Sequence, residues 1–226
     1  MEELSSEAHA PEASMKLLYR GAEADVFRGD WCGVSAVYKM RKPLLYRLPE
    51  LDKLIRSQRT VHEAQLLHES KFAGVSAPYV FYLSPQDALL VMEFIEGQRL
   101  KNVLLEAGLA NERLDALGER FGRTVAKLHA AGIMHGDLTT SNVIVDGDSL
   151  SLIDFGLAVH SLKLEDHAVD LRLIKETLTG AHNSVSKRFM LSMMSGYSAV
   201  LGRAKAEAAA KKLAEIERRG RYARVE

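Results

Sequence analysis

The sequence predicts an α+β chain with two lobes: a small N-terminal lobe with an antiparallel sheet and a helix, and a mainly helical C-terminal lobe. Short strand-like segments punctuated by glycine occupy residues 16–40 and recur at 79–94, with one long helical pattern between them. Beyond Gly97 a single hairpin pattern stands among helical patterns. The chain has 226 residues, of which 47% are hydrophobic, so it carries enough apolar material for a sizeable core.

The N-terminal lobe is expected to contain five strands and one helix. The helix begins at Pro49, and its apolar residues recur at helical spacing up to Gly74. Turn-forming residues at 84–87 separate the last two strands. The expected strands are Leu17–Tyr19, Asp25–Arg28, Ser35–Tyr38, Tyr79–Leu83 and Ala88–Phe94.

The C-terminal lobe is expected to open with a helix over residues 111–131, whose apolar residues share one face. A loop up to Asn142 then leads into two short strands, 143–145 and 150–153, joined by an Asp146-Gly147 turn. Everything after Asp166 looks helical. The expected domains are a flexible tail at 1–14, an N-lobe at 15–95, a C-lobe at 96–217 and a basic C-terminal tail at 218–226.

The charge and cysteine content exclude some classes of protein and favour others. Lys+Arg and Asp+Glu are 30 each, so the whole chain has no electrostatic preference for nucleic acid or a membrane. No apolar run approaches the roughly 18 residues of a membrane span. The first 14 residues lack a signal-peptide pattern, and Cys32 has no partner for an internal disulfide. We therefore expect a cytoplasmic protein without membrane contact.

The segment from His135 to Asn142 carries the sharpest chemical signal. It reads His-Gly-Asp-Leu-Thr-Thr-Ser-Asn, and the hairpin that follows it ends in Asp154-Phe-Gly. An Asp and an Asn five apart, then a hairpin, then Asp-Phe-Gly is the arrangement of a kinase active site. Carboxylate and amide oxygens suit Mg²⁺, so we expect Asn142 and Asp154 to hold the metal of Mg²⁺-ATP, and Asp137 to orient the attacking hydroxyl or water and accept its proton.

A kinase site also needs a lysine on the third strand and a glutamate on the helix that follows. Lys39 closes the third expected strand, and Glu63 lies on the long helix, with Glu69 as a fallback on the same helix. Ordinary solvated surface charges are the alternative for both residues. The expected order along the chain favours a catalytic pair.

The nucleotide is expected to meet two further segments. The backbone of Glu93 and Ile95 suits the adenine edge, with Met92 packed behind it. The glycine-rich loop of ordinary kinases is replaced by the single-glycine turn Gly21, Ala22, Glu23 and Ala24, so its hold on phosphates is expected to be looser or rearranged.

Two departures in the second lobe point away from broad protein phosphorylation. Thr139 stands where protein-serine kinases commonly carry a lysine. The loop after Asp154 is very short, and no Ala-Pro-Glu element follows it. Little room therefore remains for an activation loop or for a peptide-docking groove.

A dense basic run closes the chain. Its arginines can contact phosphates, and Tyr222 could stack on an unpaired base. Basic residues that stabilise the end of a helix through its dipole are the alternative. The candidate tRNA-binding arginines of this tail are Arg218, Arg219, Arg221 and Arg224.

The sequence resembles the small atypical kinase subunit of the KEOPS (EKC) complex, the PRPK family, a relative of the Rio kinases. The resemblance runs from Gly21 onward. It rests on Gly21–Ala24, the Tyr46–Asp52 run, Arg59–Ala64, the loop 135–142, Ile153–Leu157, Glu165–Leu171 and the terminal Arg218–Arg221. It implies a protein-kinase-like bilobal fold, with ATP and Mg²⁺ as cofactors. It also implies serine/threonine kinase activity with autophosphorylation, and an ATPase that supports threonylcarbamoyladenosine formation on tRNA.

The resemblance also implies partners. The C-lobe would dock the threonylcarbamoyl-transferase subunit, the N-lobe would dock a small regulatory subunit, and the basic tail would help hold tRNA. The chain is expected to be the stand-alone, archaeal form.

Two other functions compete: a small-molecule phosphotransferase of the aminoglycoside or choline kinase kind, and a nucleotide-binding scaffold without turnover. The first usually needs helical insertions that this C-terminal half is too short for, and the full set of catalytic residues argues against the second.

Overall fold

The computed structural model describes residues 15–222, with the backbone only for residues 220–222. The chain divides into two compact units. Of the described residues, the first unit holds 15–60 and 80–94, and the second holds 61–79 and 95–222. The expected α+β fold, sheet first and helices after, is confirmed. The expected tail at residues 1–14 lies outside the described residues.

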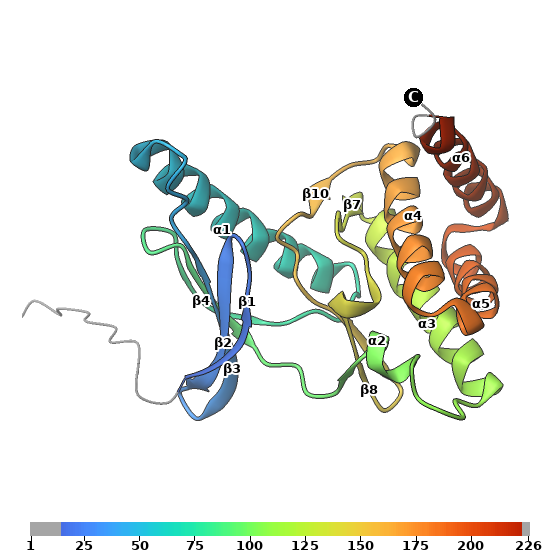
Figure 1. The fold of residues 1–226 in the computed structure, drawn as a ribbon, viewed down its shortest axis with the longest axis horizontal. Coiled ribbons are helices and arrows are strands. Elements are labelled where there is room, and N and C mark those ends of the chain that lie inside the picture. Colours follow the sequence, from blue (N-terminus) through green and yellow to red (C-terminus); the bar gives the residue numbers. More distant parts are fainter. Residues whose placement is uncertain (1–14, 223–226) are drawn as a thin grey trace, which may run out of the picture. The chain divides into compact units, whose positions relative to one another are not determined.

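The first unit is built on a five-stranded antiparallel sheet in the order β1-β2-β3-β5-β4 (Figure 1). The five strands predicted from the sequence are all present. Trp31 stacks on Tyr82 with 5.3 Å between ring centroids, and both pack against a small buried core of Ala36, Tyr38 and Val91. The strands are β1 (Lys16–Arg20), β2 (Ala24–Trp31), β3 (Val34–Arg41), β4 (Val80–Ser84) and β5 (Leu89–Glu93).

One long helix, α1 (Pro49–Phe72), starts at the proline that the sequence indicated and ends just before Gly74. Gly74 has a φ of +75°, which suits glycine at a helix C-terminus. The first part of α1 belongs to the first unit, and the helix continues into the second unit from Val61 onward. The chain passes between the units again from Phe94 to Ile95.

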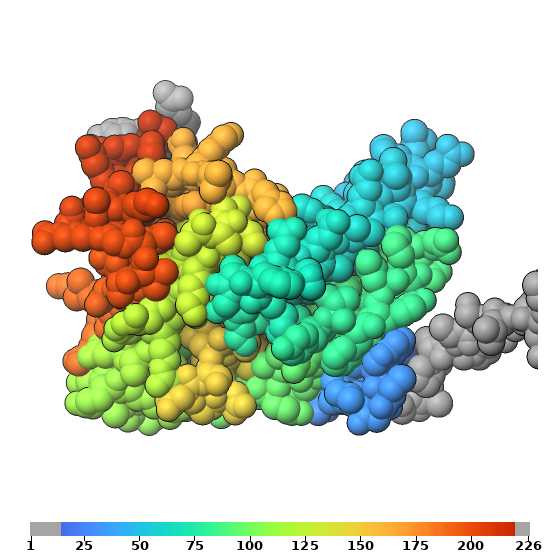
Figure 2. Space-filling model, turned by 180° about the vertical axis from the view of Figure 1, so that it is seen from behind, coloured from blue at the N-terminus to red at the C-terminus, as the bar shows by residue number. Residues whose placement is uncertain are grey.

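The second unit is a group of helices around short strand pairs. Helices α3 and α5 approach so closely that a Cβ on Gly122 would lie 1.9 Å from the Met193 carbonyl oxygen, and one on Gly196 would lie 1.9 Å from that of Glu119. Glycine is therefore required at both positions. Figures 1 and 2 show α3 bordered by the C-terminal helices. The helices are α2 (Leu100–Val103), α3 (Asn111–Ala130), α4 (Leu164–Ala181), α5 (Asn183–Leu201) and α6 (Arg203–Tyr222).

The strand pairs of the second unit frame the segments that carry the chemical signal. The predicted hairpin is present, with Gly147 at a φ of +53° in its turn. A 3-10 helix, Thr140–Asn142, precedes it. The strands are β6 (Gln98–Arg99), β7 (Ile133–Met134), β8 (Val143–Asp146), β9 (Ser149–Leu152) and β10 (Val159–His160), paired as β6-β8-β9 and β7-β10. Within residues 15–222 no helix combines the length and the apolar character of a membrane span.

Candidate active site

Asp137 and Asn142 lie together in the loop between β7 and β8. The Asn142 side-chain nitrogen donates to the Asp137 carboxylate at 2.8 Å and to the Asp137 backbone carbonyl at 2.9 Å. Because this nitrogen has two acceptors, the amide orientation is determined and the Asn142 oxygen faces away from Asp137. The backbone carbonyl of Asn142 accepts from the Ile153 N–H at 3.0 Å, which ties the loop to the residue before Asp154.

A buried carboxylate on α4 holds the start of this loop. Asp170 is fully buried, and its two oxygens accept from the backbone N–H groups of His135 at 2.6 Å and Gly136 at 2.9 Å. The His129 ring lies 3.2 Å from the same carboxylate and 2.8 Å from the Tyr197 hydroxyl. Burial raises the pKa of Tyr197, so its hydroxyl stays protonated, and the His129 ring bridges this hydroxyl and the Asp170 carboxylate. Asp170 is therefore a positioning residue for the loop.

His135 braces the same loop as a neutral ring. It is completely buried, and this burial lowers its pKa. One ring nitrogen accepts from the Asp137 N–H at 3.4 Å, and the other lies 3.2 Å from the Ile153 carbonyl, to which it donates. The ring also packs on Phe155, with 4.8 Å between centroids. His135 thus joins the loop to the Asp-Phe-Gly segment.

Asp154 adopts an unusual backbone conformation. Its φ is +62°, in the left-handed region that asparagine, aspartate and glycine tolerate best. Its carboxylate accepts from the Gly156 N–H at 3.3 Å. Nearby, a Cβ on Gly136 (φ +78°) would lie 2.2 Å from the Leu157 carbonyl oxygen, so this approach requires glycine. Strained backbone of this kind commonly marks a functional site.

The segment after Asp154 is held by the part of α1 that belongs to the second unit. His62 donates to the Ala158 carbonyl at 3.1 Å, and His160 pairs with Glu69 at 2.5 Å. Glu69, the fallback acid of the sequence analysis, thus has a histidine partner. Side chains of α1 therefore hold the short segment that follows Asp154.

The two residues expected to hold magnesium carry ligand atoms of the kind that this ion prefers. Within residues 15–222 no group of three or more His, Cys, Asp or Glu side chains could hold a metal ion. Asp154 and Asn142 supply one carboxylate and one amide oxygen. These are hard oxygen ligands of the kind that Mg²⁺ takes when phosphates and waters complete its shell.

Lys39 and Glu63 are both buried, with 7% and 1% of their surfaces exposed. Lysine and glutamate are seldom buried to this degree unless they are paired, which disfavours the reading as solvated surface charges. Lys39 lies in the middle of the sheet, opposite Val26 of β2 and Leu90 of β5. The mutual pairing of Lys39 and Glu63 stays a prediction.

The residues expected to bind the nucleotide lie at the end of β5, just after it, and between β1 and β2. Met92 and Glu93 end β5, and Ile95 begins the second unit after Phe94. The turn Gly21–Ala24 joins β1 to β2, and the Gly21 N–H donates to the Ala24 carbonyl at 2.9 Å. That N–H is therefore used inside the turn, which agrees with the expected loss of a phosphate-cradling loop.

The basic C-terminal run is partly helical. Helix α6 continues to Tyr222, beyond the expected helix end at residue 217, so Arg218 and Arg219 lie on a helix, which agrees with the alternative reading of the run as a helix end. Arg219 lies 3.6 Å from Glu165 of α4. The Arg221 side chain and the whole of Arg224 lie outside the described residues.

Two positioning residues were not assigned a role from the sequence. Asp170 appears in a run that resembles the family, and its signal is a single acid on the apolar face of α4, beside Ala168, Leu171 and Ile174. Arg99 donates to the Ser141 carbonyl at 2.9 Å and has no comparable signal.

The sequence of the chain is similar to those of known protein kinases. Residues 38–179 match the family model described as Protein kinase domain. The chain is 40% identical over 214 residues to the KEOPS complex subunit Bud32 of Pyrococcus abyssi, which covers 92% of this chain and 96% of that relative. It is 36% identical over 206 residues to the probable bifunctional tRNA threonylcarbamoyladenosine biosynthesis protein of Methanothermobacter thermautotrophicus. That match covers 91% of this chain but spans only 36% of the bifunctional relative.

A solved structure with the same fold is the Rio2 kinase ADP/Mg²⁺-phosphoaspartate complex of Chaetomium thermophilum. Its TM-score is 0.61 at 15% identity, and the match covers 90% of this chain and 70% of that chain. This likeness concerns the fold alone. The kinase model and the relative matched along nearly its whole length show the family: the chain belongs to the Bud32 family of atypical, ATP-dependent protein kinases.

Proposed function

We propose that this chain is a Mg²⁺- and ATP-dependent serine/threonine kinase and ATPase that works as a subunit of a KEOPS complex in the cytoplasm and supports threonylcarbamoyladenosine formation on tRNA. The observation that carries the proposal is the Asp137–Asn142 pair on a loop anchored by Asp170. The names of the Bud32 and bifunctional relatives support the place of this chemistry in tRNA modification.

The catalytic roles follow from what each group can do. Asp137 keeps one carboxylate oxygen on Asn142 and presents the other to the attacking hydroxyl or water, whose proton it accepts. Asn142 and Asp154 would hold Mg²⁺, which supplies charge neutralisation at the phosphates when it is bound. Lys39 would bind the α- and β-phosphates, and Glu63 would orient Lys39.

Two backbone segments would bind the nucleotide. Glu93 and Ile95 would meet the adenine edge through their backbones, with Met92 behind the ring. The turn of Gly21, Ala22, Glu23 and Ala24 would cover the phosphates. Because the Gly21 N–H already bonds within the turn, we expect fewer backbone donors for the phosphates than a glycine-rich loop offers.

The partners are assigned by the same proposal. The C-lobe would dock the threonylcarbamoyl-transferase subunit, and the N-lobe a small regulatory subunit. Arg218, Arg219, Arg221 and Arg224 would contact tRNA.

Removal of residues 218–226 is expected to weaken tRNA-dependent ATP turnover and to leave basal ATP binding intact. Equal stimulation by tRNA with and without these residues would count against the tail.

The deciding experiment measures Mg²⁺-dependent ATP hydrolysis by the chain alone, with the transferase subunit, and with both transferase and tRNA. Asp154→Asn is the matched variant, because asparagine tolerates the φ of +62° and differs from aspartate mainly in charge. We expect its turnover to fall at least about a hundredfold, since the negative charge that would hold the Mg²⁺ ion at the phosphates is removed. Full turnover in Asp154→Asn would refute the site, and turnover that ignores both partners would refute the assembly role.

A further inference from the structure

A buried histidine contacts the last turn of the loop 135–142. This turn is the 3-10 helix Thr140–Asn142, and the Thr140 side chain at its start is completely buried. The Thr140 hydroxyl lies 3.2 Å from Nε2 of His182, a residue that is 2% exposed and follows 42 positions later in the chain. Within the second unit, Asp170 therefore holds the start of the loop, and His182 contacts its end.

The backbone of His182 is fixed by two helices. Its N–H donates to the Leu178 carbonyl of α4 at 2.9 Å, and its carbonyl accepts from the Val185 N–H of α5 at 3.1 Å. The residue thus joins α4 to α5, and its side chain makes no capping hydrogen bond at the start of α5. Because both helices hold the residue, its ring provides a fixed support for Thr140.

The His182 ring destabilises the fold in a way that a helix junction does not require. Its second nitrogen, Nδ1, is buried and has no hydrogen-bond partner among residues 15–222. A buried polar atom without a partner lowers the stability of a protein. A leucine or a methionine could join two helices without this loss, so packing alone does not explain an imidazole here. What the imidazole adds is the contact with Thr140.

The His182 ring is neutral at pH 7. Burial, and to a smaller extent the charge of Lys101 on α2, lower its pKa. A neutral imidazole has one donor nitrogen and one acceptor nitrogen, and a hydroxyl can both donate and accept. The contact between Nε2 and the Thr140 hydroxyl is therefore available in either tautomer, and it does not depend on a proton taken from solvent.

The orientation of Asn142 depends on the same turn. A 3-10 helix has three residues per turn, so Thr140 and Asn142 are the two ends of one turn, and a rotation at Thr140 moves Asn142. The middle residue, Ser141, is held through its carbonyl by Arg99, but that hydrogen bond is exposed. Water competes with the Arg99 bond and is excluded from the buried contact at His182, so His182 is the firmer support.

We infer that His182 is a positioning residue of the proposed phosphotransfer reaction: through Thr140 it keeps Asn142 in the orientation that presents the amide oxygen to Mg²⁺. The inference rests on the proposed function, because it requires Asn142 as a metal ligand. Groups that orient a metal ligand typically change metal affinity or activity about ten- to a hundredfold when they are removed.

The first test measures ADP binding with and without Mg²⁺ by calorimetry, which involves no turnover. In His182→Leu the gain in ADP affinity that Mg²⁺ provides should fall about tenfold, while ADP binding without Mg²⁺ stays the same. Thr140→Val should behave alike, because valine has the shape of threonine without the hydroxyl. His182→Gln should restore most of the Mg²⁺ effect, since its amide can bond the same hydroxyl. In the double variant the two losses should not add.

The second test needs neither nucleotide nor metal. The Asn142 N–H donates to the Thr139 carbonyl at 3.1 Å, so hydrogen exchange at Asn142 reports opening of the turn. Exchange there should rise in both single variants. Ser186→Ala is the matched control, because it removes a buried hydroxyl that donates to the Asn183 carbonyl of α5 at 2.9 Å and not to the loop. The control should change neither the exchange nor the Mg²⁺ effect.

The outcomes separate this inference from the proposed function. An unmodified chain whose ADP affinity ignores Mg²⁺ would refute the proposed metal site, and the inference with it. If the unmodified chain responds to Mg²⁺, the metal site stands, and three results overturn the inference alone: unchanged exchange at Asn142, an equal loss of ADP affinity with and without Mg²⁺, or losses that add in the double variant. Thr140→Val decides the question if His182→Leu melts early.

Discussion

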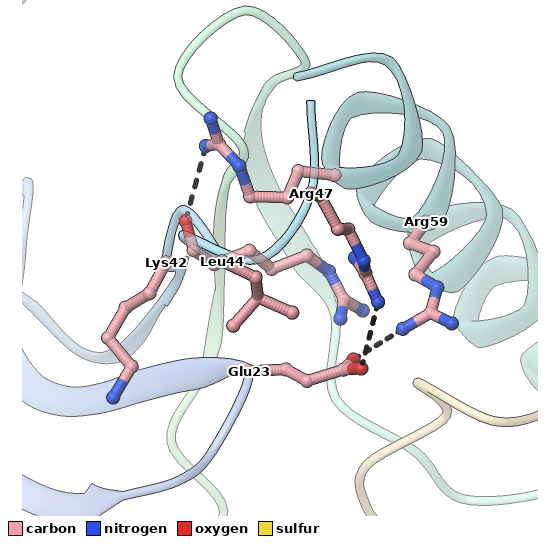
Figure 3. Close-up of a pocket in the computed structure, with 7 residues that line it drawn as sticks. Glu23, Lys42, Leu44, Arg47 and Arg59 are labelled. Atoms are coloured by element: carbon pink, nitrogen blue, oxygen red, sulfur yellow. Dashed lines mark hydrogen bonds and ion pairs between the residues drawn. The ribbon is translucent and has the colours of Figure 1, made fainter. Parts of the chain in front are cut away.

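Asp170 and Glu23 are two carboxylates that each hold a loop, but their surroundings are opposite. Asp170 is fully buried and accepts from two backbone N–H groups of the loop that carries Asp137. Glu23 belongs to the loop that it holds, is 42% exposed, and pairs with arginine side chains (Figure 3). Backbone donors in a dry interior cannot move away without leaving a buried charge unpaired, whereas arginines at the surface can turn to water or to another anion.

The difference separates a rigid loop from a releasable one. The loop 135–142 would have to present the proposed catalytic groups in one geometry, so fixed donors suit it. The turn 21–24 would have to admit and release a ligand, so a weak and exchangeable anchor suits it. Each prediction below tests one side of this contrast.

The largest effect is expected from Asp170→Ala. Removal of the buried carboxylate leaves two backbone N–H groups and His129 without their acceptor, which costs about 4 kcal/mol of unfolding free energy. Urea denaturation measures this loss. Asp170→Asn keeps the size and one acceptor oxygen, so it should retain more stability while ATP turnover still falls.

Glu23→Ala is the matched comparison for Asp170→Ala. It should cost less than about 1 kcal/mol, because the carboxylate is exposed. Similar losses in the two variants would show that burial does not separate the two anchors.

Gly136→Ala is expected to give the next largest effect. Its Cβ would lie 2.2 Å from the Leu157 carbonyl, at a φ of +78°. We expect a loss of about 2 kcal/mol and a strong fall in ATP turnover, because the segment after Asp154 must move. Gly33→Ala is the control: its φ is also positive, +85°, but its Cβ would meet no atom within 4 Å. It should cost only the backbone strain and leave turnover unchanged.

Much of the rigid loop could be predicted from the sequence, because its signal is local. Asp137 and Asn142 are five residues apart, and one turn of 3-10 helix is enough to bring them together. The role of Asp170 could not be predicted in the same way. It depends on a contact with His135, 35 residues away, which only the packing of α4 creates.

The surroundings of the basic residues were also only partly predictable from the sequence. The arginines near the C-terminus could be read from the sequence as a tail or as the end of a helix, and only the structure shows that α6 continues through Arg218 and Arg219 to Tyr222.

A pocket around Glu23 joins residues from three separate segments (Figure 3), and nothing in its local sequence marks Arg41 and Arg47 as neighbours of Arg59. Glu23 was predicted only as part of a phosphate-covering turn, which remains a proposal.

The stability of the second unit is expected to depend moderately on pH. Burial lowers the pKa of His135, His167 and His182 below the usual 6.5. Below that pH the unfolded chain takes up protons that the folded chain refuses, so stability falls as pH falls. From pH 7.5 to 6.0 the loss is at most about 0.8 kcal/mol for each such histidine, which is the free energy of protonating it in the unfolded chain alone. Urea denaturation at the two pH values measures this loss of unfolding free energy. His167→Gln should remove the part of the loss that comes from His167. A stability that rises toward pH 6.0 would contradict this reading.

The smallest effect is the salt dependence of the Glu23 anchor. Screening weakens interactions between exposed charges, so the small stability difference between the unmodified chain and Glu23→Gln should shrink further between 0.05 and about 1 M NaCl, where the Debye length falls to about 3 Å. The cost of Asp170→Asn should change far less, because salt does not reach a buried carboxylate. Thermal unfolding of the three proteins across the salt series makes the comparison. The stability lost in Asp170→Asn could instead depend on salt as strongly as the stability lost in Glu23→Gln. In that case the loop 135–142 is held by solvent-accessible charge, and the division into a rigid and a releasable loop is wrong.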